Sequence, residues 1–207
     1  MPLSLRDNVK TPHPVNASSV FGKAIAAGGT AKTYAEGMPS NSSAKNAGLY
    51  AVRHNPWTYF TPTASEHQQC LAYDVPGTAL AVDISTGTLP TVGMVIPNVC
   101  NDAHNCSLGT ADAWFKSRMA RVLAGRDFAA GRLAVILTAD EDDRTQANTV
   151  LTEVVHLSPD GVGKVVSTPL NQYSMTRFLQ DVSHSAPYLS QAATAPDLAT
   201  AFGLTTG

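Results

Sequence analysis

The chain of 207 residues is long enough for one domain, and its 43% of hydrophobic residues suffice for a core. A net charge of −2 argues against a nucleic-acid-binding protein and against a basic face for an anionic membrane. The sequence has no apolar run of about 18 residues, so we expect no transmembrane segment. Residues 1–16 lack the apolar stretch of a signal peptide.

Apolar residues predict helices and strands that alternate along the chain. After an irregular segment at 1–18, the pattern predicts a helix that begins at Val20 and stops at Gly28, and then a strand at 30–35. There follow a helix at 78–85, a strand at 91–96, a helix at 114–123, strands at 133–138 and 150–157, a short strand at 165–166 and a helix at 175–182. The Ala- and Pro-rich tail at 185–207 is expected to be irregular.

Strands that are apolar throughout are typical of a sheet with both faces covered. We therefore expect an α/β fold with a mostly parallel central sheet and helices on both faces. Ligands of such sheets bind beyond the carboxyl ends of the strands. Polar loops at 98–106 and 140–143 each follow a predicted strand, so they are the first candidates for a functional site.

Four adjacent carboxylates, Asp140 to Asp143, follow one of these strands. A cation would relieve their mutual repulsion; oxygen ligands suit Mg, Ca or Mn, and an added His would also suit Zn or Fe. An EF-hand is excluded because Thr145 and Leu151 stand where that loop has Gly and Glu. A solvated acidic turn without a metal is the alternative.

The other polar loop carries an Asp and a His between two cysteines. Cys100 and Cys106 can close a small ring, which would fix the positions of Asp102 and His104. These two residues could then serve as a metal ligand and the group that orients it, or as a base and its partner. A metal site that uses the cysteines is a second interpretation, although their spacing is unusual for zinc. A surface loop closed by a disulfide is the third. With this disulfide, Cys70 remains the free thiol.

The segment Arg53-His54-Asn55 lies in an aromatic stretch. An Arg can clamp a phosphate group and a His can protonate a leaving group. We expect Arg53, Asn98 and Asp102 to bind the substrate. The alternative is that Arg53 and His54 only pack within an aromatic turn.

Seven segments occur here in the order YAEGMPSN, LYAVRHNPWTYF, DVP, GTLPTVGMVIPNVCNDAHNCSLGTADAW, LTADEDD, NTVLTEVV and PLNQYSMTRF. Together they resemble the bacterial phosphoesterase family, which holds acid phosphatases and secreted phosphatidylinositol-3-phosphatase-like enzymes and is related to non-specific phospholipases C. The resemblance covers most of 19–182, and PNVCNDAHNC and ADEDD are its most specific pieces. It predicts a phosphoesterase domain at 19–184, between the segment 1–18 and the tail 185–207.

The resemblance implies an alkaline-phosphatase-like fold and the hydrolysis of a phosphate ester at a divalent metal ion. It implies that Asp140 and Glu141 bind the metal and that His104 and His54 are catalytic. The substrate would be a small phosphorylated molecule or a phospholipid headgroup. It also implies that the full-length protein is secreted.

The chain departs from the family at two places. Full-length members begin with a strand that ends in a Glu-Asn pair of metal ligands, and a Ser or Thr nucleophile follows. The resemblance starts after both, so we expect a chain truncated at its N-terminus, with the first strand missing. The family's Asn-His-Tyr-Ser segment contains Gln172 here, so an active-site His is absent.

The main functional prediction is a metal-dependent phosphomonoesterase of the acid-phosphatase type, incomplete in this chain and with little turnover by itself. One alternative is a phosphodiesterase of the phospholipase C type. The other is a catalytically inactive fragment that binds a metal or phosphate.

Overall fold

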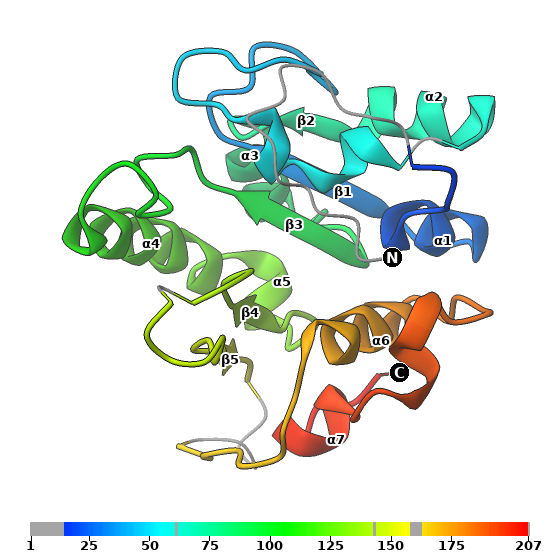
Figure 1. Ribbon diagram of the computed structural model, residues 1–207, viewed down its shortest axis with the longest axis vertical. Coiled ribbons are helices and arrows are strands. Elements are labelled where there is room, and N and C mark those ends of the chain that lie inside the picture. Colours follow the sequence, from blue (N-terminus) through cyan, green and yellow to red (C-terminus); the bar gives the residue numbers. More distant parts are fainter. Residues whose placement is uncertain (1–14, 61, 143, 158–162, 207) are drawn as a thin grey trace.

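The computed structural model describes residues 15–60, 62–142, 144–157 and 163–206, and its centre is a three-stranded parallel sheet (Figure 1). The strands lie in the order β2-β1-β3 and comprise β1 (Ala31–Ala35), β2 (Asp74–Pro76) and β3 (Val92–Ile96). β1 pairs with β3 from Ala31 opposite Val92 to Ala35 opposite Ile96. The carboxyl ends of these two strands therefore meet at one edge of the sheet.

Helical segments cover one face of this sheet. They are α1 (Val20–Ala26), η1 (Val52–His54), η2 (Pro56–Tyr59) and α2 (Ala64–Tyr73). The rings of Phe21 and Trp57 stack with their centroids 4.8 Å apart, and both are buried with Ala31, Cys70 and Val92. This apolar cluster holds α1, α2 and η2 against the sheet.

The opposite face packs against α3 (Ala79–Thr86), which in turn contacts α4 (Leu108–Leu123) and α5 (Arg126–Ala129). Tyr34 and Val75 of the sheet are buried with Leu80 and Ile84 of α3, and Val122 of α4 packs against the same cluster. The three-stranded sheet is thus covered by helices on both faces.

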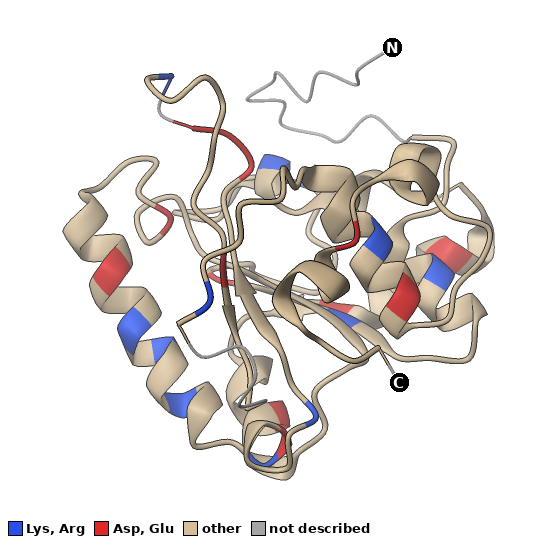
Figure 2. Ribbon diagram, turned by 90° about the horizontal axis from the view of Figure 1, so that it is seen from below, with Lys and Arg blue, Asp and Glu red and all other residues tan. Residues whose placement is uncertain are grey.

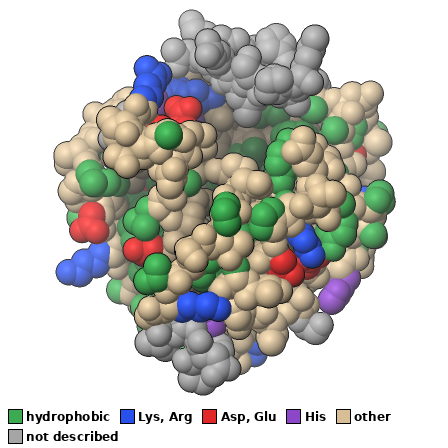
Figure 3. Space-filling model, turned by 60° about the horizontal axis from the view of Figure 1, so that its bottom comes forward, with side chains coloured by type: hydrophobic (Ala, Val, Ile, Leu, Met, Phe, Trp, Pro, Cys, Tyr) green, Lys and Arg blue, Asp and Glu red, His purple; other side chains and the backbone are tan. Residues whose placement is uncertain are grey.

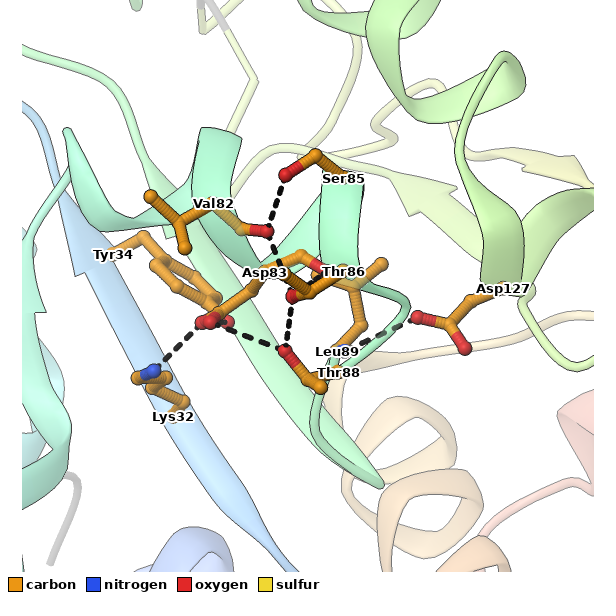
Figure 4. A network of polar contacts seen from close by, with 9 residues as sticks. All are labelled: Lys32, Tyr34, Val82, Asp83, Ser85, Thr86, Thr88, Leu89 and Asp127. Atoms are coloured by element: carbon orange, nitrogen blue, oxygen red, sulfur yellow. Dashed lines mark hydrogen bonds and ion pairs between the residues drawn. The ribbon is translucent and has the colours of Figure 1, made fainter.

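A polar network joins α3 to the sheet (Figure 4). Asp83 Oδ2 accepts hydrogen bonds from Lys32 Nζ and Tyr34 Oη, both at 2.6 Å. Thr88 Oγ1 donates to Asp83 Oδ1 at 3.4 Å, and the backbone N–H of Leu89 donates to an oxygen of Asp127 at 3.1 Å. Lys32 and Tyr34 reach the same carboxylate because alternate residues of a strand share a face.

A second group of elements lies below this sheet in Figure 1. It contains an antiparallel pair of strands and three helical segments: β4 (Val135–Leu137), β5 (Glu153–Val155), α6 (Gln172–Val182), η4 (Ser190–Thr194) and α7 (Leu198–Phe202). Phe178 of α6 is buried with Leu198 and Ala199 of α7, and Ile136 of β4 packs against them.

The structure confirms the α/β class and the helices and strands predicted before residue 125. Two expectations about the sheet are wrong. The apolar run at 133–138 does not join the parallel sheet, because β4 pairs with β5 after the chain turns back on itself. β3 is not fully buried, because it is an edge strand; Met94 is 39% and Val95 43% exposed.

Two further expectations near the C-terminus are wrong. Residues 165–166 form no strand, and Val165 is 92% exposed. The tail beyond 185 is not irregular, because its apolar residues form α7, which Asp197 caps by accepting the backbone N–H of Thr200 at 3.1 Å. The predicted domain limits stay predictions, and of segment 1–18 only 15–18 lie within the described residues.

The surface matches the low net charge of the chain. On the face drawn in Figure 3, hydrophobic side chains are scattered among polar ones, and basic side chains do not gather into one patch. Within the described residues, no helix is both long and apolar enough to cross a bilayer.

Candidate active site

His54 and Asp102 lie in contact at the edge where β1 and β3 end. His54 closes η1, Asp102 lies in the loop after β3, and His54 Nδ1 is 3.0 Å from Asp102 Oδ2. Burial and the positive charge of Arg53 lower the pKa of His54, although the negative charges of Asp102 and Asp140 oppose this shift. His54 is therefore neutral at pH 7, with Nδ1–H donated to Asp102 and Nε2 as the ring atom that can accept a proton.

A second contact joins the same two segments. Arg53 Nη2 lies 3.3 Å from His104 Nε2, and His104 Nδ1 lies 2.7 Å from Asn105 Oδ1. Because a guanidinium only donates, His104 Nε2 accepts here and Nδ1–H donates to Asn105. The rings of His54 and His104 have their centroids 5.7 Å apart. Four predicted site residues thus converge: Arg53, His54, Asp102 and His104.

The polar loop at 98–106, here called the cysteine loop, has the predicted disulfide. Cys100 and Cys106 are bonded, and Cys70 is free and buried, with its Sγ 2.8 Å from Ser42 Oγ. Asn98, predicted to bind substrate, has its Oδ1 on the backbone N–H groups of Cys100 and Asn101 at 3.0 and 3.1 Å. In this structure Asn98 therefore shapes the loop.

A buried carboxylate fixes the residue next to His54. Asp74 is 0% exposed and accepts hydrogen bonds from Thr33 Oγ1 at 2.6 Å and from Asn55 Nδ2 at 3.0 and 2.8 Å. Burial raises the pKa of Asp74 to about 6, although the hydrogen bonds from Thr33 and Asn55 oppose the rise. Through Asn55, the sheet holds the turn that carries Arg53 and His54.

The acidic turn after β4 is exposed and largely held by its own backbone. The Asp142 carboxylate accepts backbone N–H groups of Arg144, Gln146 and Asn148 at 2.9, 2.7 and 2.9 Å. Asp140 Oδ1 accepts the backbone N–H of the next residue, Glu141, at 3.0 Å. Figure 2 shows the acidic stretch leading into a loop that projects from the rest of the molecule.

A side chain of α6 reaches this turn. Gln172 Nε2 donates to the carbonyl oxygens of Ala139 and Asp140 at 3.0 and 3.4 Å. Gln172, the residue at the position of the expected active-site His, thus lies beside the predicted metal ligand Asp140. A Gln side chain there supports the backbone of the turn.

Comparison with known proteins decides the family. A family model described as the Phosphoesterase family matches residues 4–151, which is more than half of the chain. The chain belongs to the phosphoesterase family. Phosphatidylinositol-3-phosphatase from Mycobacterium tuberculosis is 28% identical over 201 residues, which are 94% of this chain and 62% of that protein. The chain therefore spans less than two thirds of this relative's length.

The predicted metal ligands of this phosphoesterase do not form a complete site. Among residues 15–60, 62–142, 144–157 and 163–206, no three His, Cys, Asp or Glu side chains converge as metal ligands do. Asp140 acts on His54 through its charge, whereas the Glu141 side chain makes no hydrogen bond or ion pair with His104 in the described part of the chain. Asp143 lies outside the described residues. Two exposed carboxylates alone do not fit the usual ligand number of a protein metal site.

Two carboxylates of this phosphoesterase were missed in the sequence. Glu36 accepts hydrogen bonds from the cysteine loop and from α4, and Asp74 accepts those of Thr33 and Asn55. The signal for Glu36 was its place as the first polar residue after the strand at 30–35, the same argument that singled out the two polar loops. Asp74 had no comparable signal, because its partners are distant in the sequence.

Proposed function

We propose that this phosphoesterase hydrolyses phosphate esters at the edge where β1 and β3 end. The observation that carries the proposal is the convergence of Arg53, His54, Asp102 and His104 from two separate segments. A transferring phosphoryl group needs positive charge on its oxygens and a side chain that moves a proton. Arg53 supplies the first and His54 the second.

In the proposed reaction, Arg53 binds non-bridging phosphate oxygens with the donors that do not face His104. Neutral His54 accepts a proton at Nε2 from the attacking water, while its Nδ1–H stays hydrogen-bonded to the Asp102 carboxylate. The water oxygen bonds to phosphorus as the bond from phosphorus to the alcohol oxygen breaks on the opposite side, where the alcohol oxygen takes a proton from solvent. The His54 imidazolium then returns its proton to water. Asp102 orients the ring and stabilises the imidazolium, as a carboxylate does in an Asp-His pair.

A divalent metal ion is part of the proposal, with Asp140 and Glu141 as its first ligands. When bound, it would add positive charge near the phosphoryl group. Two ligands do not complete a site, so no step above depends on the metal. We also propose an alkaline-phosphatase-like arrangement and secretion; the disulfide supports secretion because such bonds persist in oxidising compartments.

The proposed substrate is a phosphomonoester on a lipid headgroup or a small molecule. Its support is the name of the relative from Mycobacterium tuberculosis, a phosphatidylinositol-3-phosphatase. We expect turnover by the chain itself to be low, because no hydroxyl nucleophile and no third metal ligand are among the groups that converge here.

Binding is therefore tested before turnover. In a titration with inorganic phosphate, followed by NMR of the histidine rings, we expect saturable shifts of His54 and His104 that Arg53→Ala removes. Asp112→Asn, an exposed change on α4, is the matched control and should bind as the parent does. Phosphate that leaves both rings unchanged in the folded protein would refute the site.

Turnover is then measured with an aryl phosphate, an aryl phosphodiester and a short-chain phosphatidylinositol 3-phosphate, each with Mg, Mn, Zn or a chelator. Release of phosphate from the two monoesters by the parent protein, and its loss in His54→Ala, would support the proposal. Cleavage of the diester alone would replace it with a phospholipase C-type activity, and phosphate binding without any turnover would leave a binding protein.

A further inference from the structure

We propose that Glu36 is a positioning residue whose carboxylate, at the end of β1, fixes the loop that presents Asp102 and His104 to the phosphate group. The role assigned to that loop rests on the proposed function. The placement of Glu36 rests on its own contacts.

The backbone of Glu36 continues the pairing of the sheet. Glu36 follows Ala35, the last residue of β1, and its N–H donates to the carbonyl oxygen of Ile96 at 2.9 Å. A Cβ added at Gly77 would lie 3.1 Å from Glu36 Cα, so the chain passes close to Glu36 and leaves its backbone little room to shift. The side chain therefore starts from a fixed point.

One carboxylate oxygen holds the beginning of the cysteine loop. Pro97 has no N–H, so Asn98 carries the first backbone donor after β3. That N–H donates to Glu36 Oε2 at 3.2 Å, and Asn101 Nδ2 donates to the same oxygen at 2.8 Å. Both donors belong to the turn that leads into Asp102.

The other oxygen holds the helix that follows the loop. Glu36 Oε1 accepts hydrogen bonds from Trp114 Nε1 at 2.9 Å and from Arg118 Nη2 at 3.2 Å, both on α4. The Arg118 guanidinium also lies over the Trp114 ring, with its carbon 5.3 Å from the centroid. One carboxylate thus ties both ends of the loop to the sheet.

The charge of Glu36 fits this role. Its side chain is 23% exposed. Burial by itself would raise the pKa of Glu36, but hydrogen bonds from Asn101, Trp114 and Asn98 and the charge of Arg118 outweigh burial and lower it. Glu36 is therefore ionised at neutral pH, and an ionised carboxylate accepts hydrogen bonds at both oxygens.

The disulfide and Glu36 have separate effects on the loop. The Cys100–Cys106 bond closes the loop on itself, whereas Glu36 connects the loop to β1 and α4. Without the Glu36 carboxylate, the closed loop would keep its shape but move relative to η1. The contacts of His54 with Asp102 and of His104 with Arg53 would then lengthen together.

The test compares Glu36→Gln with Asp83→Asn. Asp83 is a matched control because it also accepts several side-chain hydrogen bonds beside β1, but from Lys32, Tyr34 and Thr88 and not from the loop at 98–106 (Figure 4). We expect Glu36→Gln to raise amide hydrogen exchange at 99–106 about tenfold. NMR cross-relaxation between the rings of His54 and His104, whose centroids are 5.7 Å apart in the parent, should weaken as the loop moves away from η1. Asp83→Asn should change neither quantity.

Asn101→Ala gives a second route if Glu36→Gln does not fold. It removes one donor to Glu36 without altering the sheet, and the same two changes should appear at smaller size. Loop exchange and a His54–His104 ring contact that stay at parental values in either folded variant would overturn the proposal. Failure of phosphate to shift the histidines of the parent protein would refute the proposed function and leave the Glu36 result standing.

Discussion

The two polar loops that follow β3 and β4 are held in different ways. The cysteine loop is tied to distant parts of the chain, by Glu36 to β1 and α4 and by two side-chain contacts to η1. The acidic turn is held mainly by Asp142, which accepts backbone N–H groups within the same turn, and by Gln172.

This difference shows which half of the site is organised in advance. The groups that face each other across the cysteine loop already have partners and fixed tautomers. Asp140 and Glu141 are exposed, and the carboxylate that orders their turn serves the backbone instead of a ligand. A metal or substrate would have to order the acidic side, whereas the histidine side is preorganised.

The largest expected effect comes from Asp102→Asn. Any phosphatase activity of the protein should fall by about 10²–10⁴ in kcat, because an Asn can no longer select the ring tautomer of His54. Loss of the Asp102 charge also lowers the pKa of His54 further, so the acidic limb of the kcat profile should move to lower pH. Profiles of kcat against pH for both proteins check this, and a limb that moves to higher pH would contradict the Asp-His pair.

Asp74→Asn should change how stability depends on pH. The pKa of Asp74 is raised from 3.8 to about 6, so the folded protein binds an extra proton between these values and loses stability as pH rises through them. A shift of this size corresponds to about 3 kcal/mol. Urea unfolding from pH 4 to 7 should show the difference in unfolding free energy between parent and variant changing by up to this amount. A difference that does not change with pH would show that folding leaves the pKa of Asp74 unchanged.

Reduction of the Cys100–Cys106 bond should have a smaller effect. Loop-closure entropy for so short a ring corresponds to about 2 kcal/mol of the free energy of unfolding. We expect a reductant to lower the urea midpoint of the parent accordingly. The double variant Cys100→Ser, Cys106→Ser should be insensitive to the reductant. A midpoint of the double variant that still falls would mean that the reductant acts elsewhere.

The smallest effect is expected from Asp142→Asn in the acidic turn. Asp142 is only partly buried and lies in an exposed turn, so the thermal midpoint should change little, while amide exchange at 144–148 should rise as three hydrogen bonds weaken. Exchange at 98–106 should stay at the parental level. A coupled change in the cysteine loop would show that the two loops do not act independently.

The sequence predicted the members of the histidine site but neither their mutual contacts nor their supports. Arg53, His54, Asp102 and His104 could be found because each lies in a motif with its own chemistry. Glu36 could not be assigned a role, because its donors are 62 to 82 residues away along the chain, and such pairing follows only from the folded sheet.

The sheet was predicted in part for a related reason. An apolar run has the same pattern whether the strand joins a central sheet or a separate pair. The sequences of β3 and β4 therefore have the same apolar pattern, although β3 lies at the edge of the parallel sheet and β4 pairs with β5. The tail was misjudged because its small residues carry little helical periodicity, while packing against Phe178 stabilises α7.

Side chains alternate between the two sides of β1, and this limits which sequence changes the strand can accept. Thr33 faces Asp74 on one side of the strand, Lys32 and Tyr34 face Asp83 on the other, and Glu36 follows its last residue. A single inserted residue would turn every later side chain to the opposite face. It would separate these carboxylates from their donors at once, although no catalytic group would be altered. We expect this short segment to accept substitutions more readily than any change in its length.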